Sequence, residues 1–316
     1  MKFAFLAQAR AQYRAFLGYS SLCSVQPCDR DWRVRLVCGR NPTSKKLAKI
    51  LFTSTRNLEK LSKNTSLYHC WDEPKKNGGV RTIEAPYDNL KIIQKRIAEL
   101  LHRIEPPDFL MAPVKRRSYV HNAAIHVGAR AFRLLDIENF FPSCTDKKVY
   151  WFFHKKMHCA PDVAAILTKL ATFNGHLPQG SPCSPILAYN AYMDMWEEIS
   201  TIIAPSNCRL SIYADDITIS GTTVYERDVW AVKQALHRHG HRYSCRKERR
   251  LINKAADITG VIVSGDDLLL PNRQHKQLRS LIKQRQAGGH GKHRETLDRQ
   301  LRGRMAQANQ ILRHPL

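Results

Sequence analysis

Apolar positions along the chain follow two periods, and each predicts its own kind of element. Residues 66–86 alternate between apolar and polar on either side of the turn KKNGG, which predicts a β-hairpin. From Tyr87 to about Ile104 the apolar residues recur at helical spacing, which predicts a helix that ends before Pro106. The chain is therefore expected to mix strands with helices.

The middle of the chain carries the strongest strand patterns. AFRLLDI at 131–137 is predicted to be a buried strand with an acid at its end, and RLSIYADDITIS at 209–220 predicts two strands joined by a tight turn. The loop HLPQGSPCSP at 176–185 opens onto a predicted helix. The other elements expected here are helices at about 145–157, 161–172, 186–199 and 225–239, and one strand at 257–264.

Both ends of the chain are predicted to be helical and basic. The first residues form an amphipathic pattern too broken for a signal peptide, so 1–40 is expected to be an N-terminal helical extension. The stretch 271–316 is rich in Lys and Arg, and only Glu295 and Asp298 oppose them, with GGHG at 288–291 expected to join two helices. This basic tail is either a face for nucleic acid or only a solvated surface.

Composition narrows the class of partner. The 316 residues include 51 Lys and Arg against 27 Asp and Glu, a formal charge of +24. Such an excess usually meets a polyanion, most often nucleic acid, although a merely basic protein is the alternative. No stretch approaches a membrane span, so no membrane partner is expected. Nine cysteines without a C-x-x-C pair indicate reduced thiols in a cytoplasmic protein and no zinc site.

Three aspartates stand at the ends of apolar strands. Asp215 and Asp216 are adjacent between β-forming residues, and Asp136 closes the strand at 131–137. Adjacent charges beside buried strands are expensive to desolvate unless a cation neutralises them, although an ordinary Asp-rich turn is the alternative. Two Mg²⁺ ions held by shared carboxylates would serve phosphoryl transfer, and the carbonyl of Ile137 could be a further oxygen ligand.

Six motifs resemble those of reverse transcriptases, and they occur in that family's order. They are VRTIEAP at 80–86, HNAAIH at 121–126, LLDIENFFPS at 134–143, LPQGSPCSP at 177–185, YADD at 213–216 and ITGVIVS at 258–264. N-A-x-x-H within the second motif resembles the mark of retron reverse transcriptases, and ITG resembles their V-T-G segment with Ile in place of Val. The resemblance covers about 70–265.

The resemblance implies roles for individual residues. It makes Asp136, Asp215 and Asp216 the catalytic, metal-binding acids. Asn122 and His126 are implied to be RNA contacts or local scaffolding, whereas Arg279 and Lys283 of the basic tail are expected to bind RNA. The residues implied to surround the incoming nucleotide are Arg81, Phe141, Gln179, Gly180 and Lys247.

Two of these roles have alternatives. Phe141 would exclude a 2′-OH, but it could also only pack beside Phe140. Lys247 would act near the leaving pyrophosphate. The chain departs from the family pattern here, because Ser244 stands where related enzymes have Asn, and Arg246 or Arg249 could serve instead.

The implied fold is α+β with the right-hand polymerase arrangement. Fingers and a palm with a small antiparallel sheet are expected within 41–270, and a basic helical thumb at 271–316. The implied function is an RNA-directed DNA polymerase that uses dNTPs and copies a structured retron non-coding RNA into a branched RNA–DNA hybrid (msDNA).

In such systems the product and the enzyme restrain a separate effector protein in anti-phage defence. A non-catalytic RNA-binding scaffold with this fold, or a reverse transcriptase of another lineage such as the group II intron type, are the alternatives.

Overall fold

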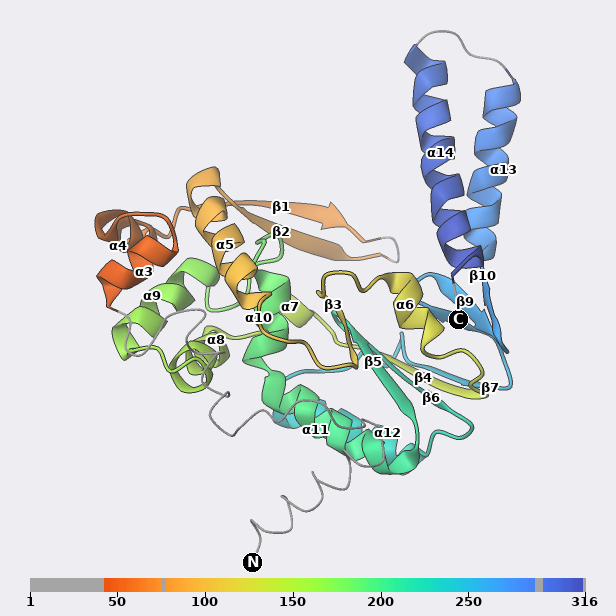
Figure 1. The fold of residues 1–316 in the computed structure, drawn as a ribbon, viewed down its shortest axis with the longest axis horizontal. Helices are drawn as coiled ribbons and strands as arrows, with labels where there is room; N and C mark the ends of the chain where they lie inside the picture. Colours follow the sequence, from red (N-terminus) through yellow and green to blue (C-terminus); the bar gives the residue numbers. More distant parts are fainter. Residues whose placement is uncertain (1–42, 76–77, 288–291, 315–316) are drawn as a thin grey trace, which may run out of the picture.

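The computed structural model describes residues 43–75, 78–287 and 292–314. The N-terminal extension expected at 1–40 and the GGHG joint at 288–291 lie outside the described residues. A group of helices and a β-hairpin lie on one side of a central sheet, and a helical hairpin projects beyond the other side (Figure 1).

The described helices fall into three groups along the chain. Those before the central sheet's first long strand are α3 (Ser44–Ile50), α4 (Thr55–Lys63), α5 (Asp88–Leu101) and α6 (Tyr119–Ala124). Those of the middle are α7 (Phe140–Ser143), α8 (Asp146–Trp151), the π-helix η2 (Phe152–Lys156), α9 (Pro161–Ala171), α10 (Ser184–Ala191), α11 (Met193–Ile203), the 3-10 turn η3 (Ala204–Ser206) and α12 (Glu226–Arg238). The last are α13 (Asn272–Gln286) and α14 (Lys292–Leu312).

The strands form three sheets. The two-stranded hairpin contains β1 (Tyr68–Pro74) and β2 (Val80–Pro86). The five-stranded central sheet has the order β3 (Leu110–Ala112), β5 (Arg209–Tyr213), β6 (Asp216–Gly221), β4 (Ala131–Asp136) and β7 (Arg249–Ile252). The three-stranded sheet has the order β10 (Asp267–Leu269), β9 (Val261–Ser264) and β8 (Ala256–Ile258).

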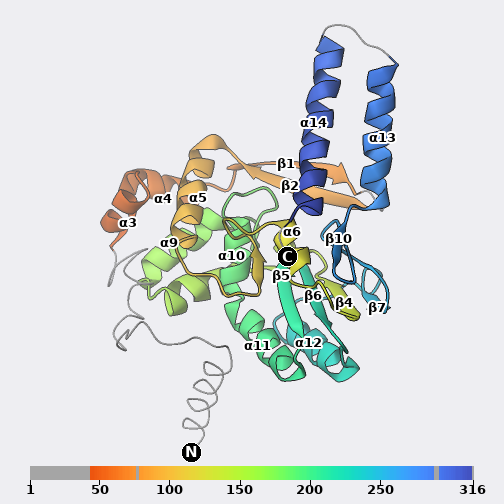
Figure 2. The same cartoon turned by 45° about the vertical axis from the view of Figure 1, so that its right-hand side comes forward.

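The central sheet has one face buried by helices. Every neighbouring pair is antiparallel except β3 and β5, which run parallel. Helices α11 and α12 lie beneath the sheet in both views (Figures 1 and 2). Trp196 of α11 and Val232 of α12 belong to the same buried cluster as Ile217 and Ile219 of β6. This apolar support holds the strands that carry the acids.

A second, smaller core lies at the root of the helical hairpin α13–α14. It joins Val120 and Ala123 of α6, Phe132 of β4 and Ile311 of α14 to the inner face of the three-stranded sheet. Residues of α6, of the central sheet's β4, of the three-stranded sheet and of α14 therefore meet in this core.

Most predicted elements are confirmed. The expected hairpin at 66–86 is β1–β2, the helix after Tyr87 is α5, and RLSIYADDITIS forms β5 and β6 around a tight turn. The helix expected at 145–157 is α8 continued by the π-helix η2. No helix in the described part of the chain is both long and apolar enough to cross a bilayer.

Two predicted elements were wrong in number. The single helix expected over 186–199 is two, because the chain breaks at Tyr192, whose φ is −116° and ψ 25°. The phenol of Tyr192 donates to the Ser143 carbonyl and accepts from the Thr145 N–H, so tertiary contacts set this break. The single strand expected at 257–264 is the hairpin β8–β9.

Helix α5 offers a matched test of how much the helical layer contributes to stability. Ile97 is buried against α9 and its neighbours, whereas Ile92 on the same helix is 65% exposed. Ile97→Ala should lower the free energy of unfolding by about 2–5 kcal/mol. Ile92→Ala should change it by no more than about 0.5 kcal/mol. Denaturant unfolding measures both, and equal losses would show that the described packing of α5 is wrong.

Candidate active site

The three predicted aspartates converge at one end of the central sheet. Asp136 is the last residue of β4, and its register partner on β6 is Asp216. Asp215 lies in the two-residue turn between β5 and β6, next to Ala214 with φ 57°. The N–H of Ile137 donates to the Asp215 carbonyl over 3.0 Å, which ties the turn to the end of β4. Acids that are far apart in the sequence therefore share one site.

The end of β4 is fixed on its other side by residues 242–244. Ser244 N–H donates to the Asp136 carbonyl over 2.8 Å, and Glu138 N–H donates to the Arg242 carbonyl over 2.8 Å. Asn139 then adopts a left-handed φ of 46° that turns the chain into α7. Backbone hydrogen bonds on both sides of β4 thus hold Asp136 rigidly, as a metal or phosphate site requires.

Burial and mutual repulsion dominate the electrostatics of the acids. Burial, and then the charges of Asp215 and Asp136, raise the pKa of Asp216 to about 7. Burial and Asp136 likewise raise the pKa of Asp215, against the opposing effect of Lys247 and Arg81. The site thus lacks enough positive charge to neutralise its carboxylates, which is the condition in which a bound cation stabilises a fold.

Lys247 is the cation closest to the acids. Its Nζ lies 2.6 Å from Asp136 Oδ1. The turn that presents it is closed by N–H groups of Lys247 and Glu248, both donating to the Ser244 carbonyl. Of the three candidates left open by the sequence, Lys247 is therefore the one that contacts an acid. Its role toward pyrophosphate stays a prediction.

A cleft of about 560 Å³ opens in front of the acids. Both acidic and basic side chains line it: Asp136, Asp216, Asp257, Arg246, Lys247, Arg249 and Arg273. The turn Thr259–Gly260 and strand residues of β4 and β6 complete the wall. A groove lined by both acids and arginines suits a substrate that carries phosphates.

The acids have the donor atoms that a hard divalent cation prefers, but their side chains are too widely spaced in this structure to hold one together. Carboxylate oxygens are the ligands that Mg²⁺ prefers. Among the described residues, however, no group of three His, Cys, Asp or Glu side chains stands close enough together to hold a metal ion. A bound cation would offset the repulsion between these carboxylates.

The residues predicted to surround the nucleotide come from two neighbouring segments. Arg81 is exposed on β2, and its charge contributes to lowering the pKa of Asp215. Gln179 lies in the loop after η2 and α9, and its carbonyl accepts from Glu84 N–H over 2.9 Å.

Gly180 is needed for the packing of the loop, and its predicted approach to a ligand stays a prediction. Its φ is +143°, and a Cβ there would lie 2.9 Å from the Glu84 carbonyl oxygen. The close neighbour is therefore the backbone of β2. The loop and the hairpin fit together only with glycine at this position.

Phe141 lies on α7 directly after the strand that carries Asp136. It is half-buried, and its ring centroid lies 5.6 Å from that of Phe140. Sequence reasoning missed His241, which is fully buried beneath this turn and whose Nδ1 lies 2.7 Å from Ser143 Oγ. No local pattern marks His241, because this bond reaches a residue far away in the sequence.

Asn122 and His126 are both fully buried, so neither offers a surface to RNA in this structure. Both the RNA-contact role and the alternative of local scaffolding stay predictions, and the burial of the two side chains favours scaffolding. The physical reason lies in their partners: His126 is bonded to Ser211 and Ser220, and Asn122 to Thr259.

Arg279 and Lys283 lie one turn apart on α13 and are exposed or partly exposed, as an RNA-binding role requires. Arg285 on the same helix is instead ion-paired with Asp298 of α14. The basic tail thus divides into side chains that hold the two helices together and side chains available to a polyanion.

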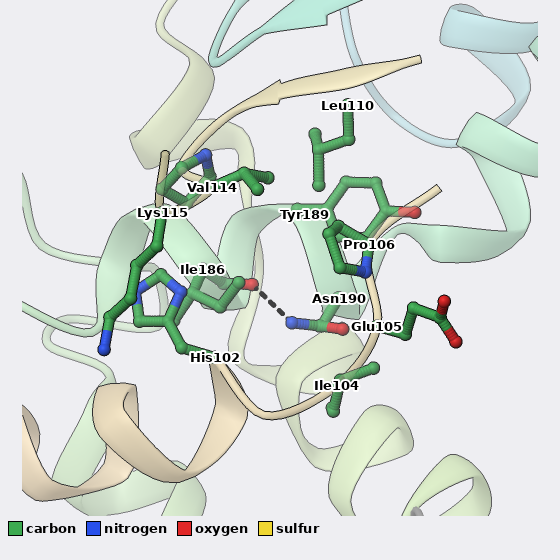
Figure 3. Close-up of a pocket in the computed structure, with 11 residues that line it drawn as sticks. His102, Ile104, Glu105, Pro106, Leu110, Val114, Lys115, Ile186, Tyr189 and Asn190 are labelled. Atoms are coloured by element: carbon green, nitrogen blue, oxygen red, sulfur yellow. Dashed lines mark hydrogen bonds between the residues drawn. The ribbon is translucent and has the colours of Figure 1, made fainter. Parts of the chain in front are cut away.

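A separate cavity of about 160 Å³ lies away from the acids, where the loop after α5 meets α10 (Figure 3). Its wall includes His102, Leu110, Lys115 and Tyr189, and Asn190 Nδ2 donates to the Ile186 carbonyl beside it. None of the predicted site residues lines this cavity. The predicted catalytic residues Asp136 and Asp216 line the cleft described above instead.

A family model described as reverse transcriptase (RNA-dependent DNA polymerase) matches residues 73–263, more than half of the chain. The chain belongs to the reverse transcriptase family. The match includes the central sheet with its three aspartates and most of the β1–β2 hairpin, and it ends before α13. Members of the family generally use divalent metal ions.

Curated relatives are retron reverse transcriptases. The chain is 37% identical over 149 residues to Retron Se72 reverse transcriptase of Salmonella heidelberg (strain 579083-10), covering 47% of this chain and 39% of the relative. It is 26% identical over 215 residues to Retron Ec86 reverse transcriptase of Escherichia coli, covering 64% of each. It is 28% identical over 233 residues to Retron Mx65 reverse transcriptase of Myxococcus xanthus, covering 67% of this chain and 54% of the relative.

The predicted retron-type reverse transcriptase and its α+β polymerase fold are confirmed by these matches. The matched regions span only 39% to 64% of those three relatives' lengths. A solved foamy viral protease–reverse transcriptase in complex with double-stranded DNA covers 67% of this chain and 32% of its own, with a TM-score of 0.42 and 17% identity.

The raised pKa of Asp216 predicts a pH-dependent stability. Because the folded pKa of about 7 exceeds the ordinary value, the native state binds more protons than the unfolded state between about pH 4 and pH 7, so stability falls as pH rises through this window. In buffer with a chelator to remove metal ions, Asp216→Asn should leave the Tm unchanged at about pH 4 and raise it by several degrees at about pH 8. Asp267→Asn, at an exposed position on β10, is the control. A gain that does not depend on pH would contradict the described electrostatics.

Proposed function

We propose that this protein is an RNA-directed DNA polymerase. The observation that carries the proposal is the pairing of Asp136 directly opposite Asp216, with Asp215 in the adjoining turn. Three carboxylates on rigid backbone, beside a cleft rimmed by arginines, are what phosphoryl transfer onto a growing strand requires.

Two Mg²⁺ ions are the proposed cofactors. Asp136, Asp215 and Asp216 would hold them, with the Ile137 carbonyl as a further ligand, and when bound they would neutralise charge on the reacting phosphate oxygens. Lys247 would leave Asp136 and turn toward the departing pyrophosphate. Its side chain is about half exposed, so it is free to do so.

The incoming dNTP would lie between the acids and the fingers. Arg81 would hold the triphosphate through its guanidinium fork, and Gln179 and Gly180 would border the base. Phe141 would lie under the sugar and exclude a 2′-OH. These assignments are supported by the position of the β1–β2 hairpin and the loop at 177–185, which hydrogen bonds bring together at Glu84.

The proposed template is a structured retron non-coding RNA, copied into a branched RNA–DNA product (msDNA). Similarity to retron reverse transcriptases supports this substrate, and so does the charge of +24. Arg279 and Lys283 on the thumb would contact phosphates. The division into fingers and palm at 41–270 and thumb at 271–316 is part of the same proposal.

A separate effector protein restrained by the enzyme and its product, in a cytoplasmic anti-phage system, completes the proposal. The relatives' retron origin supports it. No disulfide joins the cysteines that the structure describes, which suits a reducing compartment.

One observation favours a second candidate, an RNA-binding scaffold with a polymerase fold. The ion pair between Lys247 and Asp136 offsets part of the charge of the acid cluster with a side chain of the protein itself. A purified native chain that binds its RNA tightly, yet makes no DNA with Mg²⁺ and dNTPs in a primer-extension assay, would establish the scaffold instead.

The acids should be essential for synthesis and dispensable for binding. Asp215→Asn with Asp216→Asn should lower primer extension by at least about a thousandfold, because the sites for the metal ions are removed. The same protein should bind RNA with unchanged affinity and should not show the rise in Tm that Mg²⁺ gives the native chain.

The matched control is Asp266→Asn with Asp267→Asn, an adjacent exposed pair on another hairpin, which should retain synthesis. Loss of RNA binding in the Asp215 and Asp216 double variant would instead show that these acids are structural.

The thumb should contribute to the salt dependence of RNA binding. Arg279→Ala with Lys283→Ala should weaken binding and reduce the slope of log affinity against log salt by about one unit for each phosphate that is no longer neutralised. Lys60→Ala with Lys63→Ala removes the same charge from α4 in the fingers and is the control. Fluorescence anisotropy over a series of salt concentrations measures both variants. Equal effects would contradict the proposal that α13 contacts RNA specifically.

A further inference from the structure

Two sequence motifs to which the proposed function assigns no role are hydrogen-bonded to each other. N-A-x-x-H lies on α6 and the residues after it, and I-T-G forms the β8–β9 turn. Asn122 Nδ2 donates to Thr259 Oγ1 over 3.2 Å, and Thr259 Oγ1 donates to the Tyr119 carbonyl over 3.2 Å. Helix α6 therefore binds the Thr259 hydroxyl from two sides.

Thr259 has a backbone conformation that its side chain disfavours. The paired residues Ile258 and Val261 enclose a two-residue turn in which Thr259 has φ 49° and Gly260 φ 89°. Such turns favour Asn or Gly at the first position, and a β-branched residue is strained there. Strain of this kind persists where surrounding contacts fix the residue. The contacts that fix it here are the bonds of its hydroxyl to α6.

The other end of α6 is fixed to the sheet that carries the acids. His126 is fully buried, with Nδ1 2.6 Å from Ser220 Oγ on β6 and Nε2 2.8 Å from Ser211 Oγ on β5. Burial lowers the pKa of His126 to about 3, so the ring is neutral, with one nitrogen donating and the other accepting. These two strands carry the turn at Asp215.

The turn that α6 holds is part of the wall of the catalytic cleft. Thr259 and Gly260 line the same cleft as Asp136 and Asp216. Gln274 Nε2 at the start of α13 donates to the Gly260 carbonyl over 3.2 Å. The turn therefore joins three parts: the cleft, α6 and the first helix of the thumb.

We propose that Asn122, Thr259 and His126 are positioning residues, and that α6 is a bracket that sets the distance between the catalytic acids and the turn Thr259–Gly260. The turn and the root of the thumb then form a fixed support for the primer–template duplex beside the acids. The three side chains act through the backbone of the turn and the strands. This inference rests on the proposed function.

The test separates duplex positioning from folding by changes at Thr259. Thr259→Gly relieves the strained φ but removes the hydroxyl, and Thr259→Ser keeps the hydroxyl. Asp266→Gly also introduces a glycine, at the second position of the neighbouring β9–β10 turn, and it controls for a more flexible backbone in a turn that does not line the cleft. The measurements are Tm, kcat and KM for an RNA template with an annealed DNA primer, and the affinity for that duplex in metal-free buffer.

Thr259→Gly should keep the Tm within a few degrees of that of the native chain. It should raise KM and weaken duplex affinity, each by about tenfold, and change kcat by less than about threefold. Thr259→Ser and Asp266→Gly should match the native chain. Asn122→Ala should weaken affinity similarly, and adding Thr259→Gly to it should cause no further loss, because both remove the same bond.

A native KM and affinity in Thr259→Gly would overturn the inference, as would equal losses in Asp266→Gly or additive losses in the double variant. If the native chain makes no DNA, the proposed function is refuted. The duplex affinities in metal-free buffer then still test whether α6 positions the turn Thr259–Gly260.

Discussion

Crowding of negative charge at one end of the central sheet is the constraint on which the rest of the site depends. Apolar strands carry Asp136, Asp215 and Asp216 to a place where water cannot fully solvate them, and the pKa values of the two turn acids rise as a result. Only a rigid backbone can hold like charges together, and hydrogen bonds from Ile137 and Ser244 supply that rigidity. Lys247 offsets part of the charge and leaves the remainder for a cation.

The same constraint explains why two cores are needed. The larger core supports the sheet through α11 and α12, so that the strands do not yield to repulsion at their ends. The smaller core attaches the thumb through α6 and the three-stranded sheet. Under the proposed function a nucleic-acid duplex would rest on α13–α14 while its end meets the acids, so the relation between the two cores would matter to function as much as the stability of either.

Sequence patterns located the acids of the candidate site better than they predicted the long-range contacts that hold the surrounding elements in place. YADD and the strand before it located the acids because both signals are local: alternation of apolar residues, then charge. The break at Tyr192 and the turn at Thr259 carry no such signal, because contacts with distant residues decide them. For the same reason Asn122 and His126 could be recognised as a motif, while their burial and their hydrogen-bond partners needed the structure.

The contact between Gly180 and β2 has a consequence for how the enzyme would open and close. Glu84 binds the loop twice, through its N–H to the Gln179 carbonyl and through its carboxylate to His176, 2.9 Å apart in each case. Arg81 lies on the same strand, close to Glu84. Under the proposed function, β2 would hold the triphosphate and the loop at Gln179 would border the base, and these two bonds join the strand to the loop. Any movement of the β1–β2 hairpin would move the strand and the loop together. Binding of the triphosphate and alignment of the base would then occur in a single conformational change.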